Sequence, residues 1–282
     1  MNRRTFLQSV FLSSATLRAA VRPLRGPKIG VTDWNLRQSG KIEAVALARR
    51  LGFEGVEVSL GRNITDGKLP LDHPEIRQAY LAAAREQKIA LAGTCLDILH
   101  TNSLKNDKLA QKWVTDGIPI TSHLNARVML LPFFGKSALT TRAEMDYVGD
   151  VLKALAPAAE KAKVLLGLED TISAEDNVRI MERSGSPAVK VYYDVGNSTL
   201  AGFDVVREIR WLGAGRICQI HLKDNPHFLG EGKIDFPAVL DAMREIGFHG
   251  FANLETDCPT KSVDADMVRN LNYVRDIIQR NS

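Results

Sequence analysis

Apolar and polar residues follow two alternating patterns from residue 28 onward. Short runs of apolar and β-branched residues are typical of parallel strands buried on both faces. They alternate with longer stretches in which apolar residues recur every three or four positions, as on one face of a helix. The short runs predict eight strands, at residues 28–34, 55–60, 88–95, 126–134, 164–170, 189–195, 217–223 and 251–256.

Eight strand–helix units in a segment of this length have the size of a closed barrel, whereas an open doubly wound sheet usually has fewer strands and a glycine-rich first turn. The first turn here reads TDWNLRQSG. The sequence contains no dinucleotide-binding GxGxxG motif and no phosphate-binding P-loop, which argues against NAD or ATP chemistry. It therefore predicts an α/β fold, a single-domain (β/α)8 TIM barrel over residues 28–282.

Residues that favour helix boundaries flank the predicted helices. Asp235 is a good N-cap for the helix before the last strand, and Gly247 is placed to end that helix. Asp204 and Gly213 flank the preceding helix in the same way. The apolar residues after Asp235 fall on one helix face: Phe236, Val239, Leu240, Met243 and Ile246. We expect these faces to pack on the barrel.

Four polar residues stand at the ends of apolar strands, where a barrel enzyme places its active site. Glu169, Asp194, His221 and Glu255 are separated by 25, 27 and 34 residues, each about one strand–helix unit. Consecutive strands would bring them to one rim, where a divalent cation would neutralise the three carboxylates. Three oxygens and one nitrogen suit Mn²⁺, Mg²⁺ or Co²⁺, and Zn²⁺ is a further option. Any one of these residues alone would more often be a helix cap or a salt-bridge partner.

Segments around these residues resemble one known family. GLEDTISAEDN (167–177), VYYDVGN (191–197), HLKDN (221–225), LGEGKIDF (229–236) and NLET (253–256) are similar to motifs of the sugar phosphate isomerase/epimerase family, the xylose-isomerase-like barrels. The resemblance implies that Glu169, Asp194, His221 and Glu255 hold one divalent metal ion, with Mn²⁺ preferred. It also implies that Glu169 and Glu255 are catalytic acid/base residues.

The resemblance further implies a metal-dependent sugar isomerase or epimerase. A metal chelated by a carbonyl and a neighbouring hydroxyl of a small sugar or polyol acidifies the intervening C–H bond and stabilises the resulting enediolate. Two glutamates on opposite faces of the substrate would give epimerisation, and one base serving adjacent carbons would give aldose/ketose isomerisation. A lyase or dehydratase acting on a keto-sugar or keto-inositol would use the same metal and base, so that alternative stays open.

Second-tier candidates for substrate binding are Trp34, Glu57, His100, Asn197 and Lys223. Asn197 stands where some sugar epimerases of the family carry a histidine, and its amide can bond a substrate hydroxyl. Lys223 can bind substrate or form an ion pair with Asp224 or another acid. Glu57 can face the substrate or form a salt bridge inside the barrel. The tryptophan and the histidine close the first and third strands, where they can line a sugar site or simply pack.

The formal charge of +4 is concentrated at the N-terminus. The first 27 residues carry five arginines and no acid, so the remaining domain is near neutral, at about −1. That domain lacks the basic stripe with which proteins neutralise nucleic-acid phosphates. We therefore expect a small carbohydrate as the partner, and no nucleic acid.

Residues 1–27 are interpreted as a twin-arginine-type export signal and a pre-barrel segment. Arg3 and Arg4 precede Phe6 and an apolar stretch through Leu17 that is too short to span a bilayer. This pattern predicts a periplasmic or secreted protein without stable membrane anchoring. A homo-oligomer is left open.

Two other functions fit the sequence less well. An apurinic endonuclease with this barrel needs additional histidines for a multinuclear zinc site, yet only His100 lies near a strand end besides His221. A non-catalytic sugar-binding barrel would not be expected to keep all four acidic and imidazole ligands.

Overall fold

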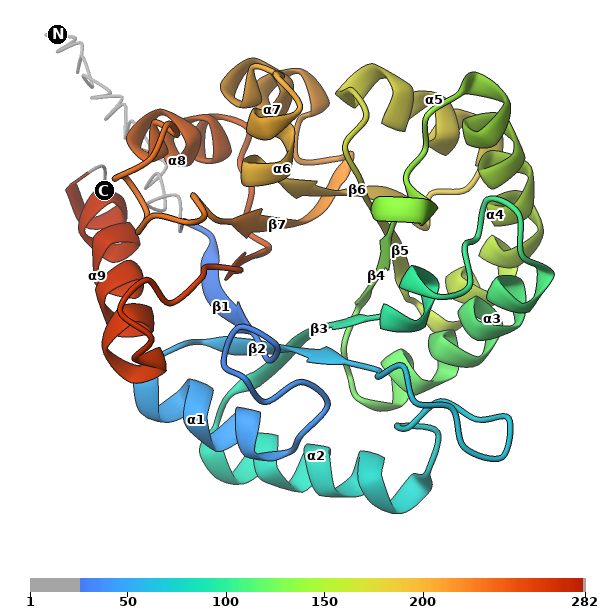
Figure 1. The fold of residues 1–282 in the computed structure, drawn as a ribbon, viewed down its shortest axis with the longest axis horizontal. Coiled ribbons are helices and arrows are strands. Elements are labelled where there is room, and N and C mark those ends of the chain that lie inside the picture. Colours follow the sequence, from blue (N-terminus) through green and yellow to red (C-terminus); the bar gives the residue numbers. More distant parts are fainter. Residues whose placement is uncertain (1–25, 281–282) are drawn as a thin grey trace, which may run out of the picture.

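Eight parallel strands form a closed barrel in the computed structural model, which describes residues 26–280 (Figure 1). Each strand pairs with its neighbours in sequence, and β8 closes the barrel against β1. The strands are β1 (Lys28–Thr32), β2 (Gly55–Ser59), β3 (Ala90–Cys95), β4 (Val128–Pro132), β5 (Leu165–Glu169), β6 (Val189–Asp194), β7 (Ile217–Leu222) and β8 (Phe251–Leu254). All eight predicted strands and the single-domain TIM barrel are confirmed, with strand bounds that differ by at most two residues from those expected.

Helices surround the strands as an outer ring (Figure 1). They are α1 (Glu43–Leu51), α2 (Pro74–Gln87), α3 (Lys108–His123), α4 (Arg142–Ala162), α5 (Ala174–Ser184), α6 (Val195–Leu200), α7 (Val205–Leu212), α8 (Phe236–Glu245) and α9 (Val263–Arg280). Short 3₁₀ turns, η1 (Asp97–His100) and η2 (Gly135–Ser137), follow β3 and β4. The apolar core lies between the helices and the strands, because the helices bury their apolar faces there.

The predicted helix boundaries are confirmed. The Asp235 side chain accepts a hydrogen bond from the backbone N–H of Ala238, and Asp204 does the same for Arg207. Gly247 and Gly213, which follow these helices, have positive φ angles of 71° and 66°. Glycine adopts that conformation without the steric penalty that other residues would meet.

Polar side chains fill the barrel interior midway along the strands. Asn253 of β8 donates hydrogen bonds from Nδ2 to Glu57 (3.2 Å), Tyr192 (2.8 Å) and Gln219 (3.0 Å), and all four residues are buried. Gly30 of β1 makes room for this layer, because a Cβ atom there would lie 2.0 Å from Asn253 Oδ1. The interior therefore supports the C-terminal end of the barrel with a connected hydrogen-bond network.

Loops at the C-terminal end are joined across strands. Asp33, directly after β1, accepts hydrogen bonds at Oδ2 from the backbone N–H groups of Gly40 (2.9 Å) and Ser59 (3.0 Å). One buried carboxylate thus fixes the loop at residues 33–42 to the end of β2.

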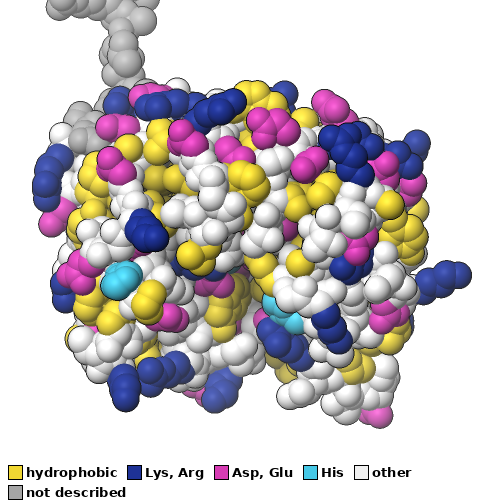
Figure 2. Space-filling model, turned by 45° about the horizontal axis from the view of Figure 1, so that its top comes forward, with side chains coloured by type: hydrophobic (Ala, Val, Ile, Leu, Met, Phe, Trp, Pro, Cys, Tyr) yellow, Lys and Arg dark blue, Asp and Glu magenta, His cyan; other side chains and the backbone are white. Residues whose placement is uncertain are grey.

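The remaining predictions concern surface charge, membrane anchoring and the export signal. Lys and Arg side chains are interspersed with Asp and Glu side chains over the face drawn in Figure 2, without a broad stripe of one sign. Within residues 26–280, no helix combines the length and the apolar character needed to cross a bilayer. The expected twin-arginine signal lies almost entirely in residues 1–25, outside the described part of the chain.

Removal of one hydroxyl from the interior network should lower stability. Tyr192 donates a hydrogen bond of 2.7 Å to Glu57 Oε2, and Tyr192→Phe leaves this buried carboxylate with one partner fewer. We expect a loss of about 1–2 kcal/mol, which lowers the melting temperature by roughly 2–4 °C per kcal/mol in a scanning calorimeter. Tyr147→Phe on α4, where the ring is 37% exposed, is the matched control and should change little. Equal melting temperatures for both variants would contradict the structural role of Tyr192.

Candidate metal centre and substrate cavity

The four residues predicted as metal ligands meet at the C-terminal end of the barrel. Glu169 and Asp194 are the last residues of β5 and β6, His221 is the fifth residue of β7, and Glu255 directly follows β8. One potential ligand atom from each lies within 4.8 Å of all the others. The parallel register produces this meeting, because β6 and β7 pair Asp194 with His221 and so deliver both side chains to the same level.

The ring of His221 is oriented by an acid on each side. Nδ1 lies 2.9 Å from Glu169 Oε1, 3.4 Å from Glu255 Oε2 and 3.7 Å from Asp194 Oδ2. Nε2 lies 2.9 Å from Glu57 Oε2. Once Nδ1 has lost its proton, Nε2 can still donate to Glu57, and the lone pair of Nδ1 is then directed at the other three acids. A carboxylate behind a histidine ligand has this effect in metal sites, where it fixes the tautomer and raises the basicity of the ring.

The position of Glu57 does not agree with a substrate contact, which was one of the two interpretations of this residue from the sequence. It is fully buried and does not line the cavity, so it does not reach a substrate there. Its Oε2 atom accepts hydrogen bonds from Tyr192 and Asn253 in addition to the contact with His221. The expected substrate contact is therefore corrected to the alternative, an interior ion pair. Its position midway along β2 places it beneath His221 rather than at the strand end.

Lys223 adds a positive charge to the cluster. Its Nζ atom lies 2.7 Å from Asp194 Oδ2 and 2.5 Å from Glu255 Oε2. Asp224 is not its partner, since that carboxylate accepts hydrogen bonds from the backbone of Gly232 and Lys233 instead. The acids therefore already contact one positively charged group, the ammonium of Lys223. Such a contact is expected at a site with excess negative charge.

A glycine leaves room for the Lys223 side chain to reach the acids. A Cβ atom on Gly196, in α6, would lie 2.4 Å from Lys223 Cγ. No ordinary side chain therefore fits at this position while Lys223 keeps its place.

Burial and mutual repulsion set the protonation of the cluster. Burial raises the pKa of the Glu169 carboxyl to about 8, and the charges of Glu255 and Asp194 add to the rise against the opposing effect of His221. Burial alone would lower the pKa of His221, but the surrounding acids, with Glu255 first, raise it well above its ordinary value. Burial likewise opposes ionisation of Asp194, yet Lys223 and His221 hold its pKa below the usual range. The group thus retains protons that a bound cation would replace.

The donor atoms fit a divalent metal ion. Three carboxylate groups and one imidazole nitrogen converge, and the second nitrogen of the imidazole is anchored by Glu57. Oxygen-rich sets of this kind suit hard divalent cations. Glu169, Asp194, His221 and Glu255 are the residues that can hold such an ion.

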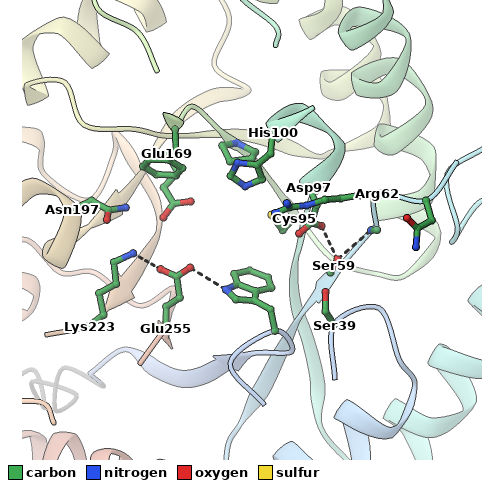
Figure 3. A pocket seen from close by; sticks show the side chains of 15 residues that line it. Ser39, Ser59, Arg62, Cys95, Asp97, His100, Glu169, Asn197, Lys223 and Glu255 are labelled. Carbon is green, nitrogen blue, oxygen red and sulfur yellow. Dashed lines mark hydrogen bonds and ion pairs between the residues drawn. The ribbon is translucent and has the colours of Figure 1, made fainter. Parts of the chain in front are cut away.

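A cavity of about 640 Å³ opens above this cluster, within the range of roughly 300–1,000 Å³ that small-molecule sites occupy. It is lined by Trp34, Ser39, Ser59, Gly61, Arg62, Asn63, Cys95, Asp97, His100, Pro132, Phe134, Glu169, Asn197, Lys223 and Glu255 (Figure 3). Four of the five second-tier candidates, all except Glu57, therefore line it.

Three of these candidates are fixed by neighbours. Trp34 donates a hydrogen bond from Nε1 to Glu255 Oε1 (2.9 Å), so its ring forms a wall beside a candidate catalytic group. Asn197 donates to Asp194 from both its backbone N–H (2.9 Å) and its side chain (3.1 Å). His100 stacks on a second aromatic ring of the lining, Phe134, at 6.3 Å between ring centroids.

The opposite side of the cavity carries further polar residues, which were not among the predicted site residues. Ser59 ends β2 and donates a hydrogen bond of 2.7 Å to Asp97 Oδ2, in η1 after β3. Arg62 and Asn63 follow in the loop after β2. The available signal was the same as for the metal ligands, polar residues just beyond apolar strands, but the bend of each loop decides which of them turn inward.

Comparison with known proteins agrees with this architecture. The 2-epi-5-epi-valiolone 7-phosphate 2-epimerase of Actinoplanes sp. is 26% identical over 230 residues, which are 77% of this chain and 82% of that protein. The L-ribulose 3-epimerase of Mesorhizobium japonicum is 34% identical over a shorter stretch of 107 residues, 34% of this chain and 36% of that protein. A structure of D-psicose 3-epimerase with D-tagatose from Clostridium cellulolyticum H10 superposes with a TM-score of 0.74 at 16% identity, covering 89% of this chain and 99% of that one.

A family match extends over most of the barrel. Residues 45–277 match the family described as xylose isomerase-like TIM barrel. This stretch contains all four candidate ligands and most of the cavity lining. The chain therefore belongs to the xylose isomerase-like TIM barrel family.

Proposed function

We propose that the protein is a divalent-metal-dependent isomerase or epimerase that transfers a proton on a small sugar or polyol. The observation that carries this proposal is the convergence of Glu169, Asp194, His221 and Glu255 at the floor of an open cavity lined with hydrogen-bonding groups. The names of the Actinoplanes and Mesorhizobium relatives, which are both epimerases, support it. Mn²⁺ is the ion we propose for the site.

In the proposed reaction the ion polarises the substrate and the protein transfers the proton. When bound, a divalent ion polarises a carbonyl and an adjacent hydroxyl, which acidifies the intervening C–H bond. Glu169 and Glu255 both line the cavity and are the groups that take and return the proton. A carboxylate that takes up a proton acts as a general base, and the carboxylic acid that it becomes can return the proton as a general acid.

The surroundings of the two glutamates hold them in different ways. Glu255 is fixed by Trp34 Nε1 and Lys223 Nζ, one bond to each carboxylate oxygen. Glu169 is held by His221. If the substrate lies between the two carboxyls, one removes a proton from one face of the carbon and the other returns it to the opposite face, which inverts the centre. If a single glutamate serves adjacent carbons, the product is the aldose or ketose isomer.

We also propose export to the periplasm or the cell exterior. The support is the pair Arg3 and Arg4 ahead of a short apolar stretch. The full chain fused to a reporter should leave the cytoplasm, and replacement of both arginines by lysine should retain it there. Equal export of the two forms would contradict a twin-arginine route.

Solvent exchange tests the proposed reaction. The metal-loaded protein should incorporate deuterium from D₂O next to the carbonyl of at least one ketose, aldose or keto-sugar, detected by NMR together with the new epimer or isomer. An eliminated product would instead assign the lyase alternative. If no compound in such a panel exchanges, the proposed function is wrong.

Loss of either acid/base group should stop this exchange. Glu169→Gln and Glu255→Gln each remove a proton acceptor while keeping the shape of the side chain, so we expect exchange rates lower by roughly 10²–10⁴-fold. Circular dichroism should show an intact barrel. Glu86→Gln, at an exposed position on α2, is the matched control and should retain full activity. Normal exchange by either cavity variant would overturn its assigned role.

Metal binding should strengthen as the pH rises. The raised pKa of Glu169, about 8, and the raised pKa of His221 mean that both groups hold protons at low pH, and these must leave before the ligand atoms bind a cation. Calorimetric titration of metal-free protein with Mn²⁺ should give about one ion per chain. Its affinity should rise up to about tenfold per pH unit between pH 6 and 8 for each proton released. An affinity independent of pH would contradict the protonation described for the cluster.

A further inference from the structure

The cavity extends beyond the candidate metal centre to a second set of polar side chains. Ser59, Arg62 and Asp97, which we call the distal group, come from the end of β2, the loop after it and the turn after β3. Figure 3 shows them across the cavity from Glu169 and Glu255. A substrate held with its reacting carbons at the two glutamates would therefore direct its other end toward the distal group.

Hydrogen bonds fix two members of the distal group, Ser59 and Asp97, in place. Ser59 Oγ donates to Asp97 Oδ2 (2.7 Å) and accepts from the backbone N–H of Gly61 (3.1 Å), and both Ser59 and Asp97 are buried. The backbone N–H of Ser59 donates to Asp33, which also holds the loop after β1. Groups that are already ordered lose little conformational entropy when a ligand binds, so this arrangement is suited to selecting a substrate.

The charge of this end of the cavity is balanced rather than positive. Burial raises the pKa of the Asp97 carboxyl, against the opposing effects of the hydrogen bond from Ser59, of backbone N–H groups and of the charge of the exposed Arg62. Burial, with a smaller contribution from Arg62, lowers the pKa of His100, so that ring is held neutral near pH 7. The cationic Arg62 and the carboxyl of Asp97 thus lie on the same side of the cavity, and no further cation of the lining stands there.

The chemistry of these groups distinguishes two kinds of substrate end. A sugar hydroxyl donates a hydrogen bond to a carboxylate and accepts one from a guanidinium, so it satisfies both Asp97 and Arg62. A phosphate dianion has no proton to give the carboxylate, and placing it beside a buried negative charge is costly. Protein sites for phosphate usually supply an excess of positive charge or several backbone N–H groups.

We propose that the distal group selects substrates by the end remote from the reacting carbons, accepting free hydroxyl groups and discriminating against a terminal phosphate ester. The inference rests on the proposed function, because that function places the reacting carbons at Glu169 and Glu255. Its specificity-determining residue is Asp97.

Paired probes test this selection. The metal-loaded full chain is given D-fructose and D-fructose 6-phosphate, and L-ribulose and L-ribulose 5-phosphate. Deuterium exchange gives kcat/KM for each compound, and calorimetry gives its Kd. We expect the wild type to prefer the free ketose of each pair by at least about tenfold. Asp97→Asn should shift that ratio toward the phosphate ester by about tenfold, because it removes the negative charge that repels the phosphate and leaves the positive charge of Arg62 to attract it.

Two further variants separate this effect from general changes. Asp66→Asn makes the same change of charge at an exposed residue outside the cavity lining, on the loop after β2, and should leave the ratio unchanged. Arg62→Gln should increase the preference for the free ketose. If Asp97→Asn fails to fold, as judged by circular dichroism, two other measurements decide whether the selection exists. They are the preference of the wild type for the free ketose and the change in that preference in Arg62→Gln.

The outcomes separate this inference from the proposed function. Exchange with a preference for phosphate esters, or with a ratio that Asp97→Asn does not move, overturns the selection and leaves the proposed function standing. Binding with the expected preference upholds the selection even where no exchange follows, and the wider panel of ketoses, aldoses and keto-sugars then decides the proposed function. If none of the four probes is bound or exchanged, the selection is overturned, and the proposed function is overturned with it only if no compound of the wider panel exchanges.

Discussion

The structure depends on how negative charge is tolerated at one end of the barrel. Four acids, Glu57, Glu169, Asp194 and Glu255, surround the imidazole of His221, and Lys223 is drawn among them. Acids buried this close repel one another and hold protons beyond their usual pH range. In a cation-free barrel, the protonation of Glu169 favours folding most strongly below its unfolded pKa near 4.5, and this contribution is lost as the pH rises through about 8. A bound cation would take the place of these protons.

The same constraint explains why the interior beneath the cluster is polar. Barrels of this type usually fill their interior with branched apolar side chains. Here a hydrogen-bonded layer of Tyr192, Gln219 and Asn253 supports Glu57, and Glu57 in turn orients His221. The site is therefore positioned from the middle of the barrel as well as from its loops, and its geometry depends on residues that no substrate touches.

Sequence patterns could locate the strands and the four ligands because both depend on local features, an apolar run and a polar residue that ends it. They could not show how far along its strand, between the middle and the C-terminal end, each polar side chain lies. In strands buried on both faces the apolar pattern does not alternate, so nothing marks Glu57 as lying midway along β2 rather than at its end. The pairing of Lys223 with Asp194 and Glu255 joins separate strands, and the inward turn of Asp97 is set by η1. Both arise from tertiary structure.

The close approach of Gly196 to Lys223 couples two positions that lie 27 residues apart in the chain. Any larger residue at position 196 would displace the lysine. Position 196 could accept a side chain only if the side chain at position 223 were shorter. Their substitutions should therefore not be additive, and an engineer who wishes to change the charge beside the acids would have to redesign both positions as one unit.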